Sequence, residues 1–173
     1  TELPRLVRSD NSYLRSWARL MFAEMEGRNT GPSEVFPPIS RAVTEPRDWE
    51  AFSIYRTARK RGEALSNKEL LECLDPGRHS LAAAVLEDTF AKYYFKWENE
   101  ETEFEDEFIE KVIEKCLLLY NCEYPRAAVP PLMTVSHFGR TKFIDTYIVL
   151  LSSPLPIIRE IAYDGLIRYG DTR

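Results

Sequence analysis

The last 22 residues, Ser152–Arg173, read SSPLPIIREIAYDGLIRYGDTR and contain the signals of one complete helix. Pro154 and Pro156 suit the first turn of a helix, where a backbone N–H has no partner inside the helix. Gly170 offers a left-handed end. Between these signals, apolar residues recur at the spacing of one helical face: Ile157, Ile158, Ile161, Ala162 and Leu166. The same pattern returns along the chain and predicts an all-α protein.

The composition is that of a folded domain. The chain has 173 residues, of which 44% are hydrophobic and 12% aromatic. A chain of this length can bury roughly two-thirds of its unfolded surface without help from a metal or a disulfide. We therefore expect a single compact α-helical domain over residues 1–173.

Cysteine usage and hydropathy indicate an intracellular protein, cytoplasmic or nuclear. The three cysteines, Cys73, Cys116 and Cys122, are odd in number and show no C-x-x-C spacing, which argues against both a disulfide framework and a zinc site. No apolar run approaches the roughly 18 residues of a membrane span, so no membrane association is expected.

The first half of the chain predicts a helix, a long connection and a second helix. Ser9 or Asp10 can cap the first helix and Gly27 can end it, with an apolar row expected to face the core and Arg15 and Arg19 beside it. Residues 27–46 hold four prolines and predict a long loop or an internal linker. Thr44 can cap the next helix, which ends before Gly62. The apolar row of the first helix comprises Tyr13, Leu14, Trp17, Leu20, Met21 and Met25, and Trp49, Phe52 and Tyr55 are expected to face inward from the second.

Three further helices are expected in the middle of the chain. Ser66 and Glu69 fit a capping box, with Leu65 and Leu70 as its hydrophobic staple, and Asp75-Pro76-Gly77 ends this short helix. A longer helix beginning at Ser80 carries a wide aromatic face, and Thr102 with Glu105 fits a second capping box. The faces expected to be buried comprise Val85, Leu86, Phe90, Tyr93, Tyr94 and Trp97, then Phe108, Ile109, Val112, Ile113, Cys116, Leu117 and Tyr120.

The stretch before the final helix is ambiguous. Residues 122–133 contain Pro125, Pro130 and Pro131 and predict a second proline-bearing loop. Residues 136–151, with His137 near the start, are expected to form a helix. The apolar run within residues 143–151 is also compatible with a buried strand, but its helical spacing and the lack of another strand to pair with favour the helix. The complete prediction is six or seven packed helices with two proline-bearing loops.

One segment resembles a known repeat. Pro156-Ile-Ile-Arg159, followed by Ala162, Leu166 and Gly170-Asp171, is similar to the first helix of a HEAT-type repeat. The resemblance covers only the C-terminal helix, and the chain shows no second copy at the period of about 40 residues that such arrays have. It implies a HEAT-like helix pair at the C terminus.

Candidate catalytic and metal-binding residues are few. His79 and His137 each lack a second ligand one helical turn away, so both are expected to be structural. A nucleophilic pair of Cys122 and His137 is formally conceivable, but no residue is placed to orient the histidine. The acidic residues 98–107 lack the glycine of an EF-hand loop and are expected to form a solvated helix start, with docking of a basic partner as the alternative.

The charge distribution suggests one candidate binding surface. Residues 1–79 carry a net charge of +1 and residues 80–173 one of −6. Cations near a helix C terminus compensate the helix dipole, but a group of them can also contact an acidic partner or phosphate. We call this group the basic cluster, and it comprises Arg56, Arg59, Lys60 and Arg61. Together with Trp97, the basic cluster is the predicted partner-binding site.

The functional prediction is a non-enzymatic helical protein-protein interaction module, a scaffold or adaptor domain. The chain has no G-x-G-x-x-G, G-x-x-x-x-G-K-[ST] or G-x-S-x-G motif, and neither a catalytic site, a cofactor nor a metal is expected. The expected partner is another protein or a second copy in a homodimer. The alternative is an RNA- or DNA-binding domain that uses the Arg-rich N-terminal part.

Overall fold

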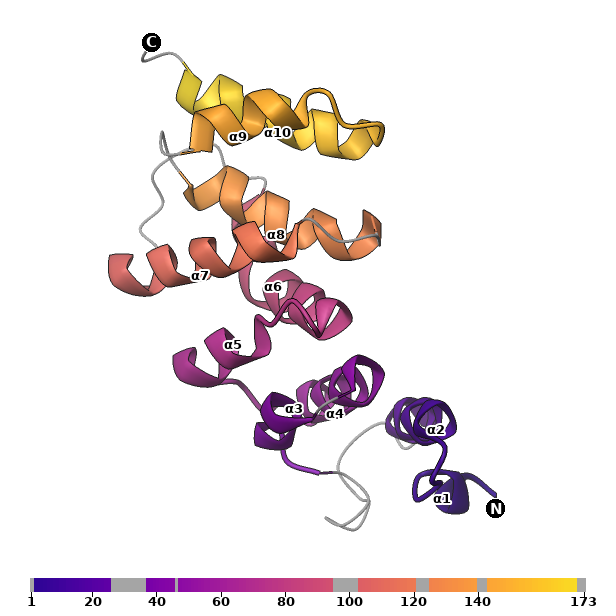
Figure 1. Cartoon of the computed structure of the whole chain (residues 1–173). Coiled ribbons are helices and arrows are strands. Elements are labelled where there is room, and N and C mark those ends of the chain that lie inside the picture. Colours follow the sequence, from indigo (N-terminus) through magenta and orange to yellow (C-terminus); the bar gives the residue numbers. More distant parts are fainter. Residues whose placement is uncertain are drawn as a thin grey trace. The chain divides into compact units, whose positions relative to one another are not determined.

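The computed structural model describes residues 2–25, 37–45, 47–94, 103–120, 125–139 and 143–170. Within these ranges every regular element is a helix and no strand occurs, which confirms the all-α prediction (Figure 1). Ten helices are present there instead of six or seven, because α1 and α3 are too short to show a periodic sequence pattern and the prolines of α8 predict a loop. The helices group into two compact units, residues 1–73 and 74–173, and we describe each by itself.

The described residues of the first unit form five helices. Helix α2 packs against α1 and α4, and α3 packs against α4 and α5. A small core lies between α1 and α2, where Val7 and Ala18 are buried among Leu3, Leu6 and Phe22. The helices are α1 (Leu3–Leu6), α2 (Ser12–Met25), α3 (Ser40–Thr44), α4 (Asp48–Lys60) and α5 (Asn67–Cys73).

Side chains cap the starts of two helices in this unit, and the sequence predicted one of these caps correctly. At α5, the Ser66 amide donates to Glu69 Oε2 over 2.9 Å and the Glu69 amide donates to Ser66 Oγ over 3.3 Å, so the predicted capping box is confirmed. At α2 the cap is Asn11, whose Oδ1 accepts from the amides of Tyr13 and Leu14. The prediction of Ser9 or Asp10 as the cap was wrong, because Asn11 lies at the residue before the first turn.

The predicted loop over residues 27–46 is partly corrected. Residues 26–36 and Pro46 lie outside the described residues, but Ser40–Thr44 forms α3 with Ala42 buried. Thr44 therefore ends a helix and does not cap the next one. Helix α4 starts at Asp48 after Arg47, without a side-chain cap. Gly62, after α4, has φ +81°, the left-handed conformation expected of a glycine at a helix end.

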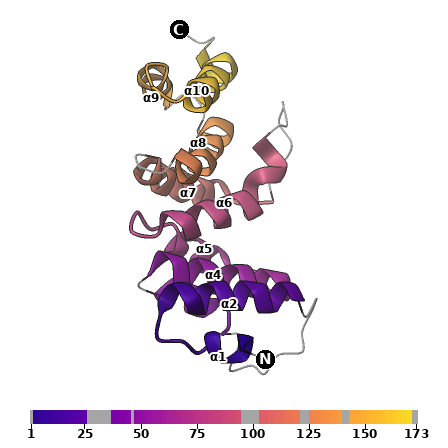
Figure 2. The same ribbon diagram turned by 90° about the vertical axis from the view of Figure 1, so that its right-hand side faces the viewer.

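The second unit is built around α8. Helix α8 packs against α6, α7 and α10, and α9 packs against α10; Figure 2 shows α9 and α10 lying side by side. Leu132 of α8 is buried with Ile158 and Ile161 of α10. The helices are α6 (His79–Tyr94), α7 (Asp106–Leu119), α8 (Pro125–Phe138), α9 (Ile144–Leu150) and α10 (Pro156–Tyr169).

The buried faces of α6 and α7 confirm most of the sequence prediction. Val85, Leu86, Phe90, Tyr93 and Tyr94 are buried on α6. On α7, the residues from Phe108 to Cys116 at the predicted positions are buried as well. The second capping box was wrong, because Glu105 is itself the residue before α7 and makes no side-chain capping bond. Thr102 and Trp97 lie outside the described residues.

Helix α8 contradicts the predicted second proline-bearing loop. Pro125 occupies its first position, where proline is favoured, but Pro130 and Pro131 lie inside the helix. A proline inside a helix removes a backbone donor and typically costs about 3 kcal/mol. Burial of this segment offsets that cost, since Ala128, Leu132 and Val135 are almost completely buried. The Thr134 hydroxyl and the Tyr94 hydroxyl also donate to the Pro130 carbonyl, over 2.9 and 3.3 Å.

Both C-terminal elements are helices, as the sequence predicts, but their ends and pairing differ from the prediction. Helix α9 confirms that the apolar run within residues 143–151 is helical, and α10 starts with Pro156 as predicted. The prediction of one helix over residues 136–151 was wrong, because α8 ends at Phe138 and α9 begins at Ile144. Gly170 does not form a left-handed end, because its φ is −77°. The HEAT resemblance placed α10 first in a pair, whereas α10 is the second helix of the α9–α10 pair and also packs on α8.

A close contact between α9 and α10 depends on a glycine. A Cβ atom added at Gly165 would lie 2.8 Å from Tyr147 Cζ and 2.9 Å from both Cε atoms. The Tyr147 ring cannot retreat easily, because it is fully buried and its hydroxyl donates to the Val135 carbonyl over 2.8 Å. The glycine therefore sets how closely the two helices approach.

We expect Gly165→Ala to lower the free energy of unfolding by about 1–3 kcal/mol, as overpacking does. In most helix interiors this substitution stabilises by up to about 1 kcal/mol, so the sign of the effect is diagnostic. Urea unfolding measures it. The matched control is Gly170→Ala, where the nearest atom to the new Cβ is 3.9 Å away. A Gly165→Ala protein as stable as this control would show that the close contact is absent.

Candidate functional site: an exposed apolar stripe on α2

The basic cluster lies at the C-terminal end of α4. Arg59 and Lys60 are exposed there, whereas Arg56 and Arg61 are half-buried. Arg59 Nη1 donates to the Glu63 carbonyl over 2.7 Å, and Arg61 forms an ion pair with the Glu63 carboxylate and a hydrogen bond of 3.0 Å to the Pro37 carbonyl. The structure brings the cluster together, with Arg59 and Arg61 holding the turn after α4. The other predicted partner-binding residue, Trp97, lies outside the described residues.

His137 lies in the last turn of α8, not near the start of a helix as predicted. Its ring packs against the rings of Tyr93 and Phe138, and Arg168 Nη1 lies 3.1 Å from Nδ1. Burial, followed by the charge of Arg168, lowers the pKa of His137 to about 4. Because a guanidinium can only donate, Nδ1 is the acceptor and the imidazole is neutral. Cys122, the other half of the conceivable nucleophilic pair, lies outside the described residues.

The neutral His137 predicts a pH dependence of stability. The pKa falls from an ordinary 6.5 to about 4 on folding, so between these values the unfolded chain binds more protons than the folded one. The contribution of the neutral His137 to the free energy of unfolding is complete above pH 6.5. It falls by about 2–3 kcal/mol as the pH is lowered toward 4. In His137→Asn, whose side-chain oxygen can still accept from Arg168, urea unfolding between pH 7 and 4 should lack this component. Equal pH dependence in both proteins would contradict a neutral, buried His137.

Of the acidic residues 98–107, the structure describes residues 103–107, and these are compatible with a solvated helix start. Asp106 and Glu107 lie in the first turn of α7, where carboxylates favour the helix dipole. Glu103 pairs with Lys92 over 2.5 Å and Glu107 pairs with Lys111 over 2.6 Å, all on the surface. Among the described residues, no group of three or more His, Cys, Asp or Glu side chains could hold a metal ion.

The most unusual surface is on α2, where the sequence predicted core. Tyr13 is 66% exposed, Trp17 44% and Met25 78%, and Leu14 is exposed as well. Met21, on the same side, is half-buried. These side chains recur at helical spacing and share one face of a 14-residue helix. We call this face the α2 stripe: Tyr13, Leu14, Trp17, Met21 and Met25. The prediction that the apolar row faces the core was wrong for the four exposed side chains, whereas Met21 and Leu20, the remaining member of the predicted row, are half-buried.

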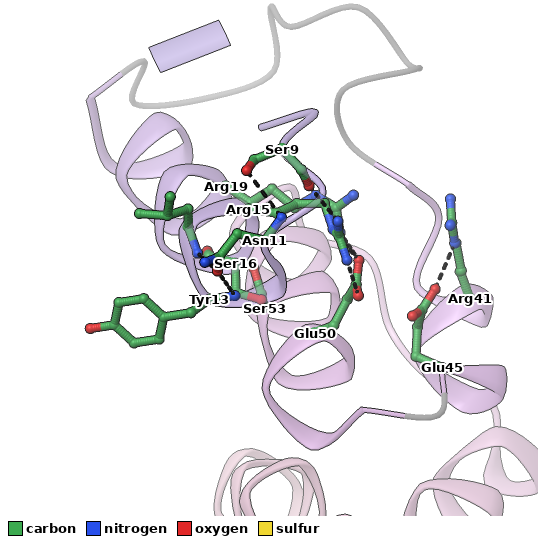
Figure 3. Close-up of polar contacts among 11 residues, drawn as sticks. Ser9, Asn11, Tyr13, Arg15, Ser16, Arg19, Arg41, Glu45, Glu50 and Ser53 are labelled. Atoms are coloured by element: carbon green, nitrogen blue, oxygen red, sulfur yellow. Dashed lines mark hydrogen bonds and ion pairs between the residues drawn. The ribbon is translucent and has the colours of Figure 1, made fainter. Parts of the chain in front are cut away.

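The opposite, polar side of α2 is the side that packs against α4. Arg15 grips Glu50 with two parallel bonds, from Nε to Oε1 and from Nη2 to Oε2, both 2.5 Å (Figure 3). Arg19 Nη1 lies 3.4 Å from the same carboxylate. Glu50 and Arg19 are only 5% and 7% exposed. Figure 3 shows Tyr13 on the side of α2 away from this network.

Small side chains let the two helices approach at the network. The Ser53 hydroxyl of α4 donates to the Ser16 carbonyl of α2 over 2.8 Å, and both serines are buried. Thr57, one turn further along α4, is fully buried and donates to the Ser53 carbonyl. A polar, close-packed interface therefore fixes the rotation of α2 about its axis, and the α2 stripe points away from α4 as a result.

The pKa values in the network follow from the pairing. Hydrogen bonds from Arg15 lower the pKa of Glu50, and the same contact raises the pKa of Arg15. Burial lowers the pKa of Arg19, although a guanidinium stays protonated in proteins. All three groups are charged, and Glu50 is the shared partner of two cations.

The sequence carried a signal for this arrangement that the periodicity analysis missed. Arg15 and Arg19 are one helical turn apart, and Glu50 lies in the first turn of α4, so all three could meet if the helices packed through them. Hydrophobic periodicity alone assigns the apolar side to the core and therefore gives the opposite rotation of α2. Trp49, also expected inside, is 58% exposed, whereas Tyr55 is buried as predicted.

No protein family, curated protein or solved structure matches this chain significantly. Among the helices that the structure describes, none is both long and apolar enough to cross a bilayer.

Proposed function

We propose that the chain is a non-enzymatic helical protein-protein interaction module and that the α2 stripe binds an apolar helix of a partner protein. The observation that carries the proposal is the exposure of Tyr13, Leu14, Trp17 and Met25 on one helical face. Trp, Tyr and Met are enriched at the buried centres of interfaces. A contiguous exposed apolar face is uncommon on a protein surface that contacts only water.

The rigidity of the stripe supports the same proposal. The bidentate Arg15–Glu50 pair and the Ser53–Ser16 contact join the opposite side of α2 to α4. The α2 stripe therefore has a fixed orientation on α4. A surface ordered before binding loses less conformational entropy when the partner docks. An intracellular location, cytoplasmic or nuclear, is part of this proposal, and the buried thiol of Cys116, which forms no disulfide, is compatible with it.

Capture from a nuclease-treated lysate tests the proposal. The wild type is compared with Leu14→Ser/Trp17→Ser, which removes two anchors of the stripe, and with the control Trp49→Ser, which removes an exposed tryptophan of α4. We expect the wild type and the control to recover the same protein partner and the stripe variant to lose it by about tenfold or more. A partner retained equally by all three proteins would overturn the proposal.

The alternative, RNA or DNA binding through the Arg-rich N-terminal part, gives a different result when the capture is repeated without nuclease. Binding that depends on phosphate neutralisation falls steeply with salt and is removed by nuclease. It would be lost in Arg56→Glu/Arg59→Glu and retained in the stripe variant. This outcome would replace the interaction-module proposal with the alternative.

A further inference from the structure

The outer face of α10 is a second surface with a defined character. Helix α10 buries Ile158, Ile161, Ala162 and Gly165, and Ile158 and Ile161 lie against Leu132 of α8. The side facing away from these residues holds a row of side chains at the spacing i, i+3, i+4 and i+7. We call this row the α10 outer face: Glu160, Tyr163, Asp164 and Ile167.

The α10 outer face is both apolar and acidic. Tyr163 is 60% exposed and Ile167 is 48% exposed. The two residues are one helical turn apart and are therefore neighbours on the helix surface. Glu160 and Asp164 are exposed beside them, also one turn apart. Two like charges at this spacing repel each other within a helix. No ion pair within the described residues engages either carboxylate.

The basic residues of α10 do not balance these charges. Arg159 Nη1 donates to the Ser153 carbonyl over 2.7 Å. Arg168 lies against His137 and donates to the Tyr94 carbonyl over 3.3 Å. Both guanidinium groups are thus directed toward the chain's own loop and core, and the exposed charge of the α10 outer face is negative.

Helices of the second unit stack on one another, and the α10 outer face lies at one side of this stack. Helix α6 packs on α8, and α8 packs on α10, so each of these helices stacks against the next. The α10 outer face is the side of α10 that lies opposite its stacking partner. A further helix could stack on the α10 outer face in the same way, with the exposed side chains of Tyr163 and Ile167 as its apolar contacts.

We propose that the α10 outer face binds an amphipathic helix of a partner protein that carries an apolar row flanked by Lys or Arg. The apolar row packs on Tyr163 and Ile167, and the cations pair with Glu160 and Asp164. A helix with an apolar row and a neighbouring charged row docks through side chains spaced one turn apart. The inference names a partner class for the proposed interaction module and rests on that proposal, but it uses a different surface from the α2 stripe.

Binding of synthetic helices tests this inference. The probes are a fluorescein-labelled peptide with Leu on one face and Lys on the other, and a matched Leu/Glu peptide, followed by fluorescence anisotropy at physiological ionic strength. We expect the wild type to bind the Leu/Lys peptide about tenfold or more tightly than the Leu/Glu peptide. Tyr163→Ser/Ile167→Ser and Glu160→Lys/Asp164→Lys should each weaken the Leu/Lys peptide by about tenfold.

The control separates the α10 outer face from general attraction between a cationic peptide and an acidic protein. Glu110→Lys/Glu114→Lys makes the same charge change at an exposed pair one turn apart on α7, and it should leave the affinity within about twofold of the wild type. The inference is overturned if this control loses binding as strongly as the α10 variants, or if the wild type binds neither peptide. It is also overturned if the wild type is a dimer in sedimentation and the α10 variants are monomers, because the occupant is then a second copy.

Failure of this inference and failure of the proposed function are distinguishable. The Leu14→Ser/Trp17→Ser variant should bind the Leu/Lys peptide like the wild type while losing the partner captured from lysate. Loss of the captured partner without any α10 effect would contradict only the α10 inference.

Discussion

Glu50→Ala is expected to lower the free energy of unfolding by about 3–5 kcal/mol, the usual effect of removing one partner of a buried ion pair. Glu50 is the shared acceptor for Arg15 and Arg19. Without it, Arg19 stays almost fully buried with no counter-charge, and desolvation of that cation favours the unfolded chain. Urea unfolding followed by circular dichroism measures the change.

A neighbouring pair provides the matched control for Glu50. Glu45 accepts from Arg41 over 2.8 Å, but the Arg41 side chain is 54% exposed. The Glu45 side chain is only 11% exposed, but the cation that Glu45→Ala leaves behind remains hydrated. This substitution is therefore expected to cost no more than about 1 kcal/mol. Equal losses in the two variants would contradict a buried network and, with it, the rotation of α2 that exposes the stripe.

Tyr147→Ala is expected to lower the free energy of unfolding by about 3–5 kcal/mol, the range for truncating a buried aromatic side chain. Tyr147 is fully buried, and its hydroxyl donates to the Val135 carbonyl over 2.8 Å. The truncation leaves a cavity between α9 and α10 and removes the partner of a buried carbonyl. Thermal and urea unfolding should both report the loss.

Tyr163→Ala is the corresponding control on the outer side of α10. Tyr163 is 60% exposed, so its truncation should change stability by less than about 0.5 kcal/mol. A large loss for Tyr163→Ala would show that the α10 outer face is covered within the folded chain. A small loss for Tyr147→Ala would show that α9 and α10 do not pack as described.

The sequence predicts helices well where local chemistry determines them. The capping box of Ser66 and Glu69 is formed as expected, because both partners lie within one turn of each other. Helix α10 begins at Pro156 for a similar reason, since the conformation of proline suits a first turn. The buried aromatic face of α6 is also correct, because in that helix most apolar side chains do face the core.

The features that the sequence did not predict depend on contacts between residues far apart in the chain. Pro130 and Pro131 predict a break in any isolated segment, but tertiary burial keeps them inside α8. The rotation of α2 is set by Glu50, which follows Arg15 by 35 residues, and periodicity within α2 contains no information about that contact. The apolar row was therefore assigned to the core, and the candidate site was sought at the basic cluster and Trp97.

Trp17 is exposed in the free protein, and we expect a bound partner to cover it. Acrylamide quenching of Trp17 fluorescence, in a Trp49→Phe/Trp97→Phe protein with and without the partner fraction recovered by capture, tests it most directly. We expect efficient quenching in the free protein and clear protection with the partner. Protection of Trp17 already in the free monomer, or equal quenching with and without the partner, would contradict the claim.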